Sequence, residues 1–402
     1  MEGERRPVAD AAVIQRVLAA RALRSLADGF IAVVLPAYLL ALGLGQLEVG
    51  VISTATLLGS ALATLAIGRW GNRFSIRRLL LAAALLMAAT GLGFAGFSSF
   101  WPLLVVAFVG TLNPSSGDAS IFMPLDHTML ANAADRTGVF TRYSFIGAMA
   151  GAVGALAAAL PDALGAHLAM VDALRLMFVL YAAAGIAAWA LYLRLPQVRA
   201  GEQQPVAPLG PSRGIVCRLA ALFSIDAFAG GLVLNSLLAL WLFERYGMSL
   251  AAAAAFFFWT GLLGACSQLA AAPLARRIGM VNTMVFTHIP SSLFLISAAL
   301  ATRVEVVLAC LLARSLLSQM DVPARGAFVM TVVTPAERPA AASFTAVPRS
   351  LASAVSPSIT GALFAAGAMA TPLIACGVLK IVYDLALYAA FRRVEAERAA
   401  TA

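Results

Sequence analysis

Gly68-Arg69-Trp70-Gly71-Asn72-Arg73-Phe74-Ser75-Ile76-Arg77-Arg78 lies between two long apolar runs, and it has a counterpart in Ala272-Pro273-Leu274-Ala275-Arg276-Arg277-Ile278-Gly279-Met280. The flanking sequences align at nearly the same offset, since Ala27-Asp28-Gly29-Phe30-Ile31 falls opposite Ala229-Gly230-Gly231-Leu232-Val233. The pattern indicates two copies of one membrane unit. Duplicated helical halves are typical of secondary transporters.

The composition places this chain in a lipid bilayer. Of its 402 residues, 61% are hydrophobic and only 12% are charged. A membrane-spanning helix needs roughly 20 apolar residues, so about twelve spans with short loops account for nearly the whole chain. This leaves no room for a soluble catalytic domain, and an all-α membrane protein is expected.

The distribution of arginine predicts the topology. With the N-terminus placed inside, the outer side carries only Arg175, Arg245 and Arg303, whereas most other arginines lie at cytoplasmic ends and loops. This positive-inside bias predicts that both termini are cytoplasmic, and it explains the net charge of +9 without a nucleic-acid partner. We expect a multi-pass protein of a bacterial inner (plasma) membrane, with a retained first helix in place of a signal peptide.

Apolar runs and one polar linker divide the chain into two pseudo-symmetric six-helix halves. The N-terminal bundle is expected at 1–195, a Pro- and Gly-rich cytoplasmic linker at 196–214, and the C-terminal bundle at 215–402. The twelve expected spans are 16–42, 47–68, 79–98, 102–130, 138–160, 170–194, 215–243, 250–271, 281–302, 304–333, 340–366 and 371–391.

This organisation resembles the major facilitator superfamily (MFS) over essentially the whole chain. In that family the loop after the second helix usually reads glycine, three variable residues, aspartate, arginine, a variable residue, glycine and then basic residues. Several residues of the paired loops match this signature or stand at its positions: Gly68, Asn72, Arg73, Arg77, Arg276, Arg277 and Gly279. Asn72 and Arg276 stand where the aspartate would be. The resemblance implies a charge clamp between helix ends, and here that clamp lacks its acid in both copies.

Ionisable residues deep in apolar spans are candidates for function, because a charge at the bilayer centre costs at least about 2.5–3.5 kcal/mol. Arg24 and Asp28 lie on one face of the first helix, and Asp28 is too short to snorkel. Asp118 belongs to a helix-breaking patch in the fourth span, and Asp226 lies at a similar depth in the seventh. An unpaired buried aspartate can hold a proton near neutral pH, so Asp28, Asp118 and Asp226 are the expected groups for proton or substrate coupling.

The second half carries further charges within its spans. Arg314, Asp321 and Arg325 form one stripe of the tenth span, and Arg349 interrupts the eleventh. Lys380 and Asp384 are spaced for an intrahelical ion pair, which is either structural or part of the coupling. The expected buried charge network is Arg24, Arg314, Asp321, Arg349, Lys380 and Asp384.

Weaker patterns suggest cavity-lining residues and a direction of transport. On the family's geometry the cavity would be lined by Tyr38, Asn113, Asn235, Trp241, Trp259, Gln268 and His288, although aromatic and amide residues of membrane helices also pack. His288 precedes Pro290, where it is either a second titrating group or a hydrogen-bonded residue at a kink. The glycines Gly138, Gly147, Gly151 and Gly154 resemble part of the signature of family antiporters, which slightly favours export.

The sequence therefore predicts a secondary active transporter that works by alternating access, a proton-coupled exporter of a small organic molecule. Two alternatives stay open: a facilitator or anion exchanger that binds its substrate through Arg314, Arg349 and Lys380, and a transport-dead membrane receptor. No nucleophile and base pair, metal spacing or nucleotide-binding loop indicates an enzyme, so no cofactor or metal is expected. The expected partners are the small-molecule substrate, protons and the lipid bilayer, and the expected state is a monomer.

Overall fold

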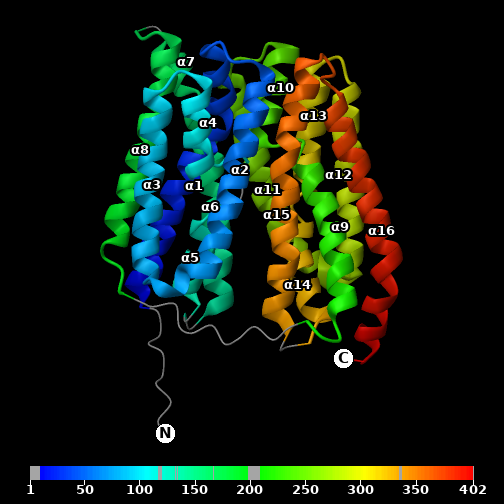
Figure 1. The fold of residues 1–402 in the computed structure, drawn as a ribbon. Helices are drawn as coiled ribbons and strands as arrows, with labels where there is room; N and C mark the ends of the chain where they lie inside the picture. Colours follow the sequence, from blue (N-terminus) through cyan, green and yellow to red (C-terminus); the bar gives the residue numbers. More distant parts are fainter. Residues whose placement is uncertain are drawn as a thin grey trace. The chain divides into compact units, whose positions relative to one another are not determined.

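We analysed a computed structural model of the chain, which describes residues 10–115, 120–131, 133, 135–165, 167–197, 209–334 and 337–401. These residues form α-helices and one short 3-10 helix (Figure 1). The elements are α1 (Ala11–Ala41), α2 (Gln46–Trp70), η1 (Gly71–Arg73), α3 (Ile76–Gly96), α4 (Phe100–Val109), α5 (Phe122–Leu130), α6 (Arg136–Ala157), α7 (Leu160–Leu164), α8 (Met170–Tyr192), α9 (Arg213–Gly231), α10 (Asn235–Tyr246), α11 (Leu250–Ile278), α12 (Met280–Leu300), α13 (Val304–Ser315), α14 (Asp321–Val332), α15 (Arg338–Ala365) and α16 (Thr371–Thr401).

Two compact units make up the chain. Unit 1 comprises 1–44, 55–203 and 249–258, and unit 2 comprises 45–54, 204–248 and 259–402. The units differ from the expected halves at two places, since the first turns of α2 pack in unit 2 and those of α11 pack in unit 1. In unit 2, for example, the hydroxyl of Ser358 on α15 donates to Thr54 Oγ1 of α2 at 2.7 Å.

The helices of the described residues match the positions of the twelve expected spans. Nine segments are long and apolar enough to cross a membrane: α1, α2, α3, α6 with α7, α8, α9 with α10, α11, α12 and α16. The other three expected spans coincide with α4 and α5, with α13 and α14, and with α15. The described residues thus form the all-helical membrane architecture that the sequence predicts.

Three expected spans are interrupted rather than continuous. The fourth breaks after Val109, as its Asn-Pro-Ser sequence suggests, because Pro114 has no amide hydrogen for a helix. The tenth breaks between Ser315 and Asp321, and the seventh between Gly231 and Asn235. Such breaks expose backbone polar groups, which membrane proteins tolerate where protein or a water-filled path satisfies them.

Small residues let the first helix of unit 1 approach α6 closely. A Cβ built on Gly29 would collide with the carbonyl of Gly151, and one on Gly154 would collide with the carbonyl of Leu26. Close backbone approach through small residues is a general way of packing membrane helices. The glycines that resemble an antiporter signature therefore have a packing role in α6.

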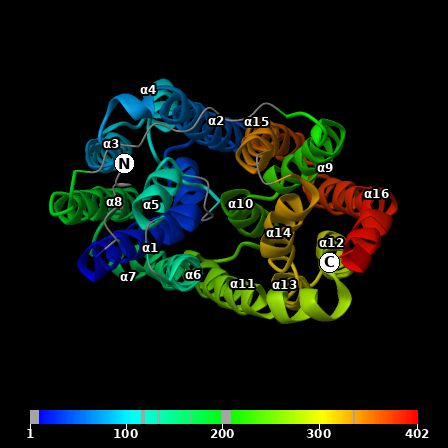
Figure 2. The ribbon, with the colours of Figure 1, turned by 90° about the horizontal axis from the view of Figure 1, so that it is seen from below.

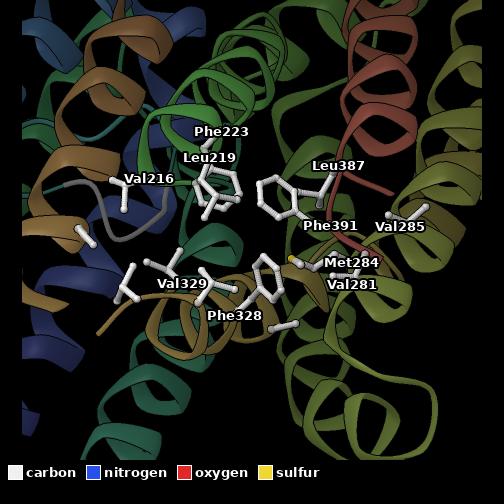
Figure 3. Packing of buried hydrophobic residues seen from close by; sticks show 14 of the residues in the cluster. Val216, Leu219, Phe223, Val281, Met284, Val285, Phe328, Val329, Leu387 and Phe391 are labelled. Atoms are coloured by element: carbon white, nitrogen blue, oxygen red, sulfur yellow. The ribbon is translucent and has the colours of Figure 1, made fainter. Parts of the chain in front are cut away.

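Unit 2 has a continuous apolar core. Side chains from α9, α12, α14 and α16 meet there, and all are less than one-tenth exposed (Figure 3). Figure 2 looks along the helices and shows α12 flanked by α13, α14 and α16, the helices with which it packs. This core includes Phe223, Phe328 and Phe391, and it holds the four helices that carry the buried charges described below.

The paired basic loops differ in backbone structure. After α2 the chain forms η1, and Ser75 caps α3 by accepting a hydrogen bond from the amide of Arg78 at 3.4 Å. In the second copy α11 runs on to Ile278 and turns at Gly279, whose φ of 89° favours glycine. Arg77 donates to the carbonyl of Leu193 at 2.5 Å, so one signature arginine holds the end of α8.

A carboxylate fastens the last residues of the expected linker. Glu337, at the N-terminus of α15, accepts hydrogen bonds from the hydroxyls of Ser212 and Thr334, each at 2.6 Å, and from the amide of Gly210 at 2.5 Å. The hydroxyls of Ser212 and Thr334 contribute most to lowering the pKa of Glu337 to about 2. Glu337 thus binds the start of α9 to the loop between α14 and α15.

Candidate functional site

A buried aspartate joins three helices of unit 2. Asp226 of α9 accepts a hydrogen bond from Lys380 Nζ of α16 at 2.6 Å and one from Arg325 Nη1 of α14 at 2.7 Å. The second amino group of Arg325 lies 3.1 Å from Asp321, four residues earlier on the same helix. Two cations thus share one carboxylate, and the geometry holds α9, α14 and α16 together.

His288 extends this ionic network to a second aspartate. Its Nδ1 lies 3.1 Å from both carboxylate oxygens of Asp384, and its Nε2 lies 3.3 Å from Lys380 Nζ. The ammonium can only donate, so these contacts assign Nδ1–H as the donor to Asp384 and Nε2 as the acceptor from Lys380. The result is an unbroken chain from Asp384 through His288 and Lys380 to Asp226.

This network has a net charge of minus one when His288 is neutral. Its members are Asp226, His288, Asp321, Arg325, Lys380 and Asp384, and only Lys380 is more than one-tenth exposed at its side chain. With neutral imidazole, the three carboxylates outweigh the two fixed cations by one charge. A single proton on the imidazole or on the carboxyl of Asp384 would therefore neutralise the network.

Two further arginines of unit 2 have no carboxylate partner in the part of the chain that the structure describes. Arg314, at the end of α13, is half-buried, and its electrostatic neighbours include Cys376. Arg349 of α15 lies within electrostatic range of Arg325 and Asp226. Arg349 was expected to be buried, but its side chain is exposed.

Unit 1 holds its own buried ionic site. Arg24 of α1 donates to Asp126 Oδ2 of α5 at 2.6 Å, with the two side chains 3% and 0% exposed. Tyr143 of α6 donates to the same oxygen at 2.9 Å, and Tyr192 of α8 contacts both Arg24 and Asp126. The guanidinium also lies 4.2 Å over the ring of Phe122, a cation–π contact. Asp126 is thus fully enclosed by protein side chains.

The two ionic sites occupy related places with opposite charge. At the offset that places Ala27 opposite Ala229, Arg24 corresponds to Asp226. In both units the first helix is paired with the second part of the broken fourth helix, through α5 in unit 1 and α14 in unit 2. The leading helix supplies the cation in unit 1 and the anion in unit 2.

The expected coupling residues fall in three different places. Asp226 lies at the centre of the unit 2 network, whereas Asp28 is half-buried on α1. Asp118 lies outside the described residues. The interpretation of Lys380 and Asp384 as an intrahelical pair is wrong, because each side chain reaches a different helix, Lys380 to α9 and Asp384 to α12.

Among the expected cavity-lining residues, only His288 belongs to the network. Tyr38 and Trp241 are fully buried, and the Tyr38 hydroxyl donates to the carbonyl of Phe94 at 2.6 Å. Two of the remaining residues bond to neighbouring side chains: the amide oxygen of Asn113 accepts from Ser115, and Gln268 bonds to Gln319 at 3.4 Å. Asn235 is half-buried at the start of α10, and Trp259 is 52% exposed.

No loop residue of the family signature is a member of either ionic site in the described part of the chain. Arg73 ends η1, Gly68 lies near the end of α2, and Arg276 and Arg277 lie in the last turn of α11. The side chain of Asn72 lies outside the described residues. In the described part of the chain no three His, Cys, Asp or Glu side chains gather as a metal site would require.

The residues that sequence reasoning missed as site members are aromatic and hydroxyl partners. Tyr143 and Tyr192 lie on separate helices far along the chain from Arg24, and no local spacing connects them. Asp126, the ionic partner of Arg24, was not among the candidate site residues either. A buried acid in the second part of a broken span, opposite an arginine on the first helix, is the signal that could have found the pair.

Paired helical units, broken fourth and tenth spans and buried ionic sites define a polytopic membrane protein with the architecture of secondary transporters. The family model of the Major Facilitator Superfamily matches residues 17–313, and the chain belongs to that family. It is 22% identical to an uncharacterized membrane protein of Saccharomyces cerevisiae, YJR124C, with 93% of each chain covered.

Solved structures of transporters share the fold. The nucleoside transporter NupG superposes with a TM-score of 0.72 at 14% identity, covering 94% of this chain and 99% of that chain. The xylose transporter XylE from E. coli gives a TM-score of 0.71 at 15% identity, covering 93% of this chain and 96% of that chain. At such identities the likeness extends to the fold alone.

Proposed function

We propose that this protein is a proton-coupled secondary transporter of a small organic molecule, working by alternating access. The observation that carries the proposal is the network around His288, which lacks one positive charge when the imidazole is neutral. A group that takes up one proton between pH 5 and 8 is suited to a proton-driven cycle, and imidazole is the side chain that ordinarily titrates there.

The surroundings of His288 support a proton-transfer step within the network. The charged and titratable groups next to it are Asp226 from α9 and Lys380, Tyr383 and Asp384 from α16. Arg325 and Asp321 of α14 join this set through Asp226. Protonated imidazole can no longer accept from Lys380, so the ammonium would lose one of its two contacts. Proton uptake would thereby exchange the contact with Lys380 for an ion pair between the imidazolium and Asp384, and leave the pair of Lys380 and Asp226.

The direction of transport is a separate part of the proposal. The sequence favours export through its glycine pattern in α6, while the same glycines serve the packing of α1 against α6. We keep export by exchange with protons as the expected direction. The test of this direction is whether an inward or an outward proton gradient drives accumulation in vesicles.

The test measures flux in proteoliposomes. Compounds that raise the melting temperature of the purified protein are first selected, and their radiolabelled forms are followed with and without a pH gradient. His288→Gln and Asp384→Asn should abolish gradient-driven accumulation while equilibrating exchange continues. Asp172→Asn, an acid that is 57% exposed on α8, is the matched control and should transport normally.

Two results would overturn the proposal. Undiminished proton-driven flux in both variants, and also in Asp28→Asn, Asp118→Asn and Asp226→Asn, removes every proposed proton site. Accumulation that persists in wild-type vesicles after collapse of the proton gradient shows another driving force. Equilibration alone in wild type indicates the facilitator alternative, and stabilisation by a compound without flux indicates the receptor alternative.

A further inference from the structure

We propose that the substrate is an organic anion, held through its carboxylate or similar group by Arg314 and Arg349 of unit 2. This inference rests on the proposed transport function and names the chemical class of its cargo. It follows from a comparison of the buried cations of unit 2 that have a carboxylate partner with the two arginines that have none among the described residues.

The paired cations are already occupied. Lys380 and Arg325 share the carboxylate of Asp226, and Arg325 also binds Asp321. A substrate anion would have to displace these acids to reach them. The sequence interpretation that counted Lys380 among the anion-binding residues is therefore replaced by one that uses the two arginines alone.

The two remaining arginines lie at similar depth along their helices. At a rise of roughly 1.5 Å per residue, Arg314 is about 15 Å along α13 from Val304, and Arg349 is about 16 Å along α15 from Arg338. Either depth is close to the middle of a hydrocarbon core about 30 Å thick. An unpaired guanidinium at this depth is costly in lipid, so each must face water or an anion.

Both arginines lie around the same buried network. Arg349 is in electrostatic range of Asp226 and Arg325, while Arg314 neighbours Cys376, which is itself in range of Lys380 and Asp226. Together with the network, they make the set of charges positive by one with neutral His288 and by two with the protonated form. An anion would neutralise this excess.

A buried donor adds a second observation. The hydroxyl of Tyr383 is 1% exposed and has no hydrogen-bond partner in the described part of the chain, although Tyr383 lies in electrostatic range of Arg349. Buried hydroxyls are ordinarily paired. A carboxylate is an acceptor that could use this hydroxyl together with the forked donors of arginine.

The test measures binding in detergent, where neither a gradient nor flux is needed. Acetate, benzoate and phthalate are compared with their neutral amides, at constant ionic strength, by the shift in melting temperature. The carboxylates should stabilise the protein and the amides should not. Arg314→Gln and Arg349→Gln should each weaken the apparent affinity about 10- to 100-fold, the effect of losing a charge-assisted hydrogen bond.

Arg303→Gln is the matched control, because Arg303 belongs to the same unit but is 78% exposed beside Glu305. A measurement on the unaltered protein guards against variants that do not fold. Phenylglyoxal labelling of Arg314 and Arg349, read by mass spectrometry, should fall when benzoate or phthalate is present, whereas labelling of Arg303 should not change.

Three outcomes overturn the anion site: no carboxylate stabilises the protein, the amides act as strongly as the acids, or the labelling of both arginines is unaffected. None of these bears on the proton coupling. If carboxylates bind but the His288 and Asp384 variants keep full gradient-driven flux, the anion site stands and the proposed coupling falls.

Discussion

The pair of Arg24 and Asp126 offers a direct measure of what a buried charge contributes to this fold. Replacing Asp126 by Asn leaves a guanidinium that is 3% exposed without its counter-charge, and replacing Arg24 by Met leaves a carboxylate that is fully buried. Breaking a buried ion pair from one side costs about 3–5 kcal/mol. Each single change should lower the free energy of unfolding by that amount.

The double variant Arg24→Met with Asp126→Leu should recover much of the loss. Replacing both partners removes the uncompensated charge and leaves apolar groups in an apolar setting. We expect the double change to cost less than the sum of Arg24→Met and Asp126→Leu, by roughly 1–3 kcal/mol, the usual range for contacting residues. Unfolding of the purified protein by SDS in mixed micelles, followed by circular dichroism, gives the free energies.

The exposed pair of Asp172 and Arg175 is the control for this cycle. These side chains are 57% and 35% exposed, so breaking their contact should change the free energy of unfolding much less than breaking the buried pair. Strictly additive costs for Arg24 and Asp126, or single changes that cost no more than those at the exposed pair, would refute the assignment of a buried, coupled ion pair.

Three further predictions concern the backbone and the linker. The stability that Glu337 contributes should be complete above its ordinary pKa near 4.5 and decline as the pH falls toward 2, where its own pKa lies, so Glu337→Gln should flatten the pH profile of the melting temperature between these values. Gly154→Val should lower the free energy of unfolding by about 1–3 kcal/mol in the SDS assay, because a side chain there meets the carbonyl of Leu26, while Gly214→Ala, which has open space, should be nearly neutral. Gly279→Ala should cost about 1–2 kcal/mol in the same assay, since φ at this position is 89°, and a cost near zero would contradict the need for a left-handed residue.

The sequence predicted the helices and their duplication well, because hydrophobic length and repeated basic loops are local signals. It predicted the interruption near Pro114, since proline and glycine act on the backbone where they stand. It did not predict the break before Asp321, although Pro323 lies in the first turn of α14. The ring of Pro323 conflicts with a helical carbonyl four residues earlier, at Gln319, which lies inside the break.

Pairing of charges was the part that the sequence could not supply. The spacing of Lys380 and Asp384 permitted a local pair, yet both side chains found partners on other helices. An i, i+4 contact contributes only about 0.2–0.5 kcal/mol on an exposed helix, which is little beside the cost of leaving Asp226 buried and alone. These pairs depend on which helices pack against each other. The packing of the helices is determined by residues along the whole chain.

The reversed charges of Arg24 and Asp226 bear on how a membrane voltage acts on the protein. An elementary charge that crosses the full potential changes in energy by about 2.3 kcal/mol per 100 mV. On the leading helix of unit 1 the field acts on a cation, and on the leading helix of unit 2 it acts on an anion. A voltage therefore pulls these two helices in opposite directions along the membrane normal, each against the helix that holds its counter-charge.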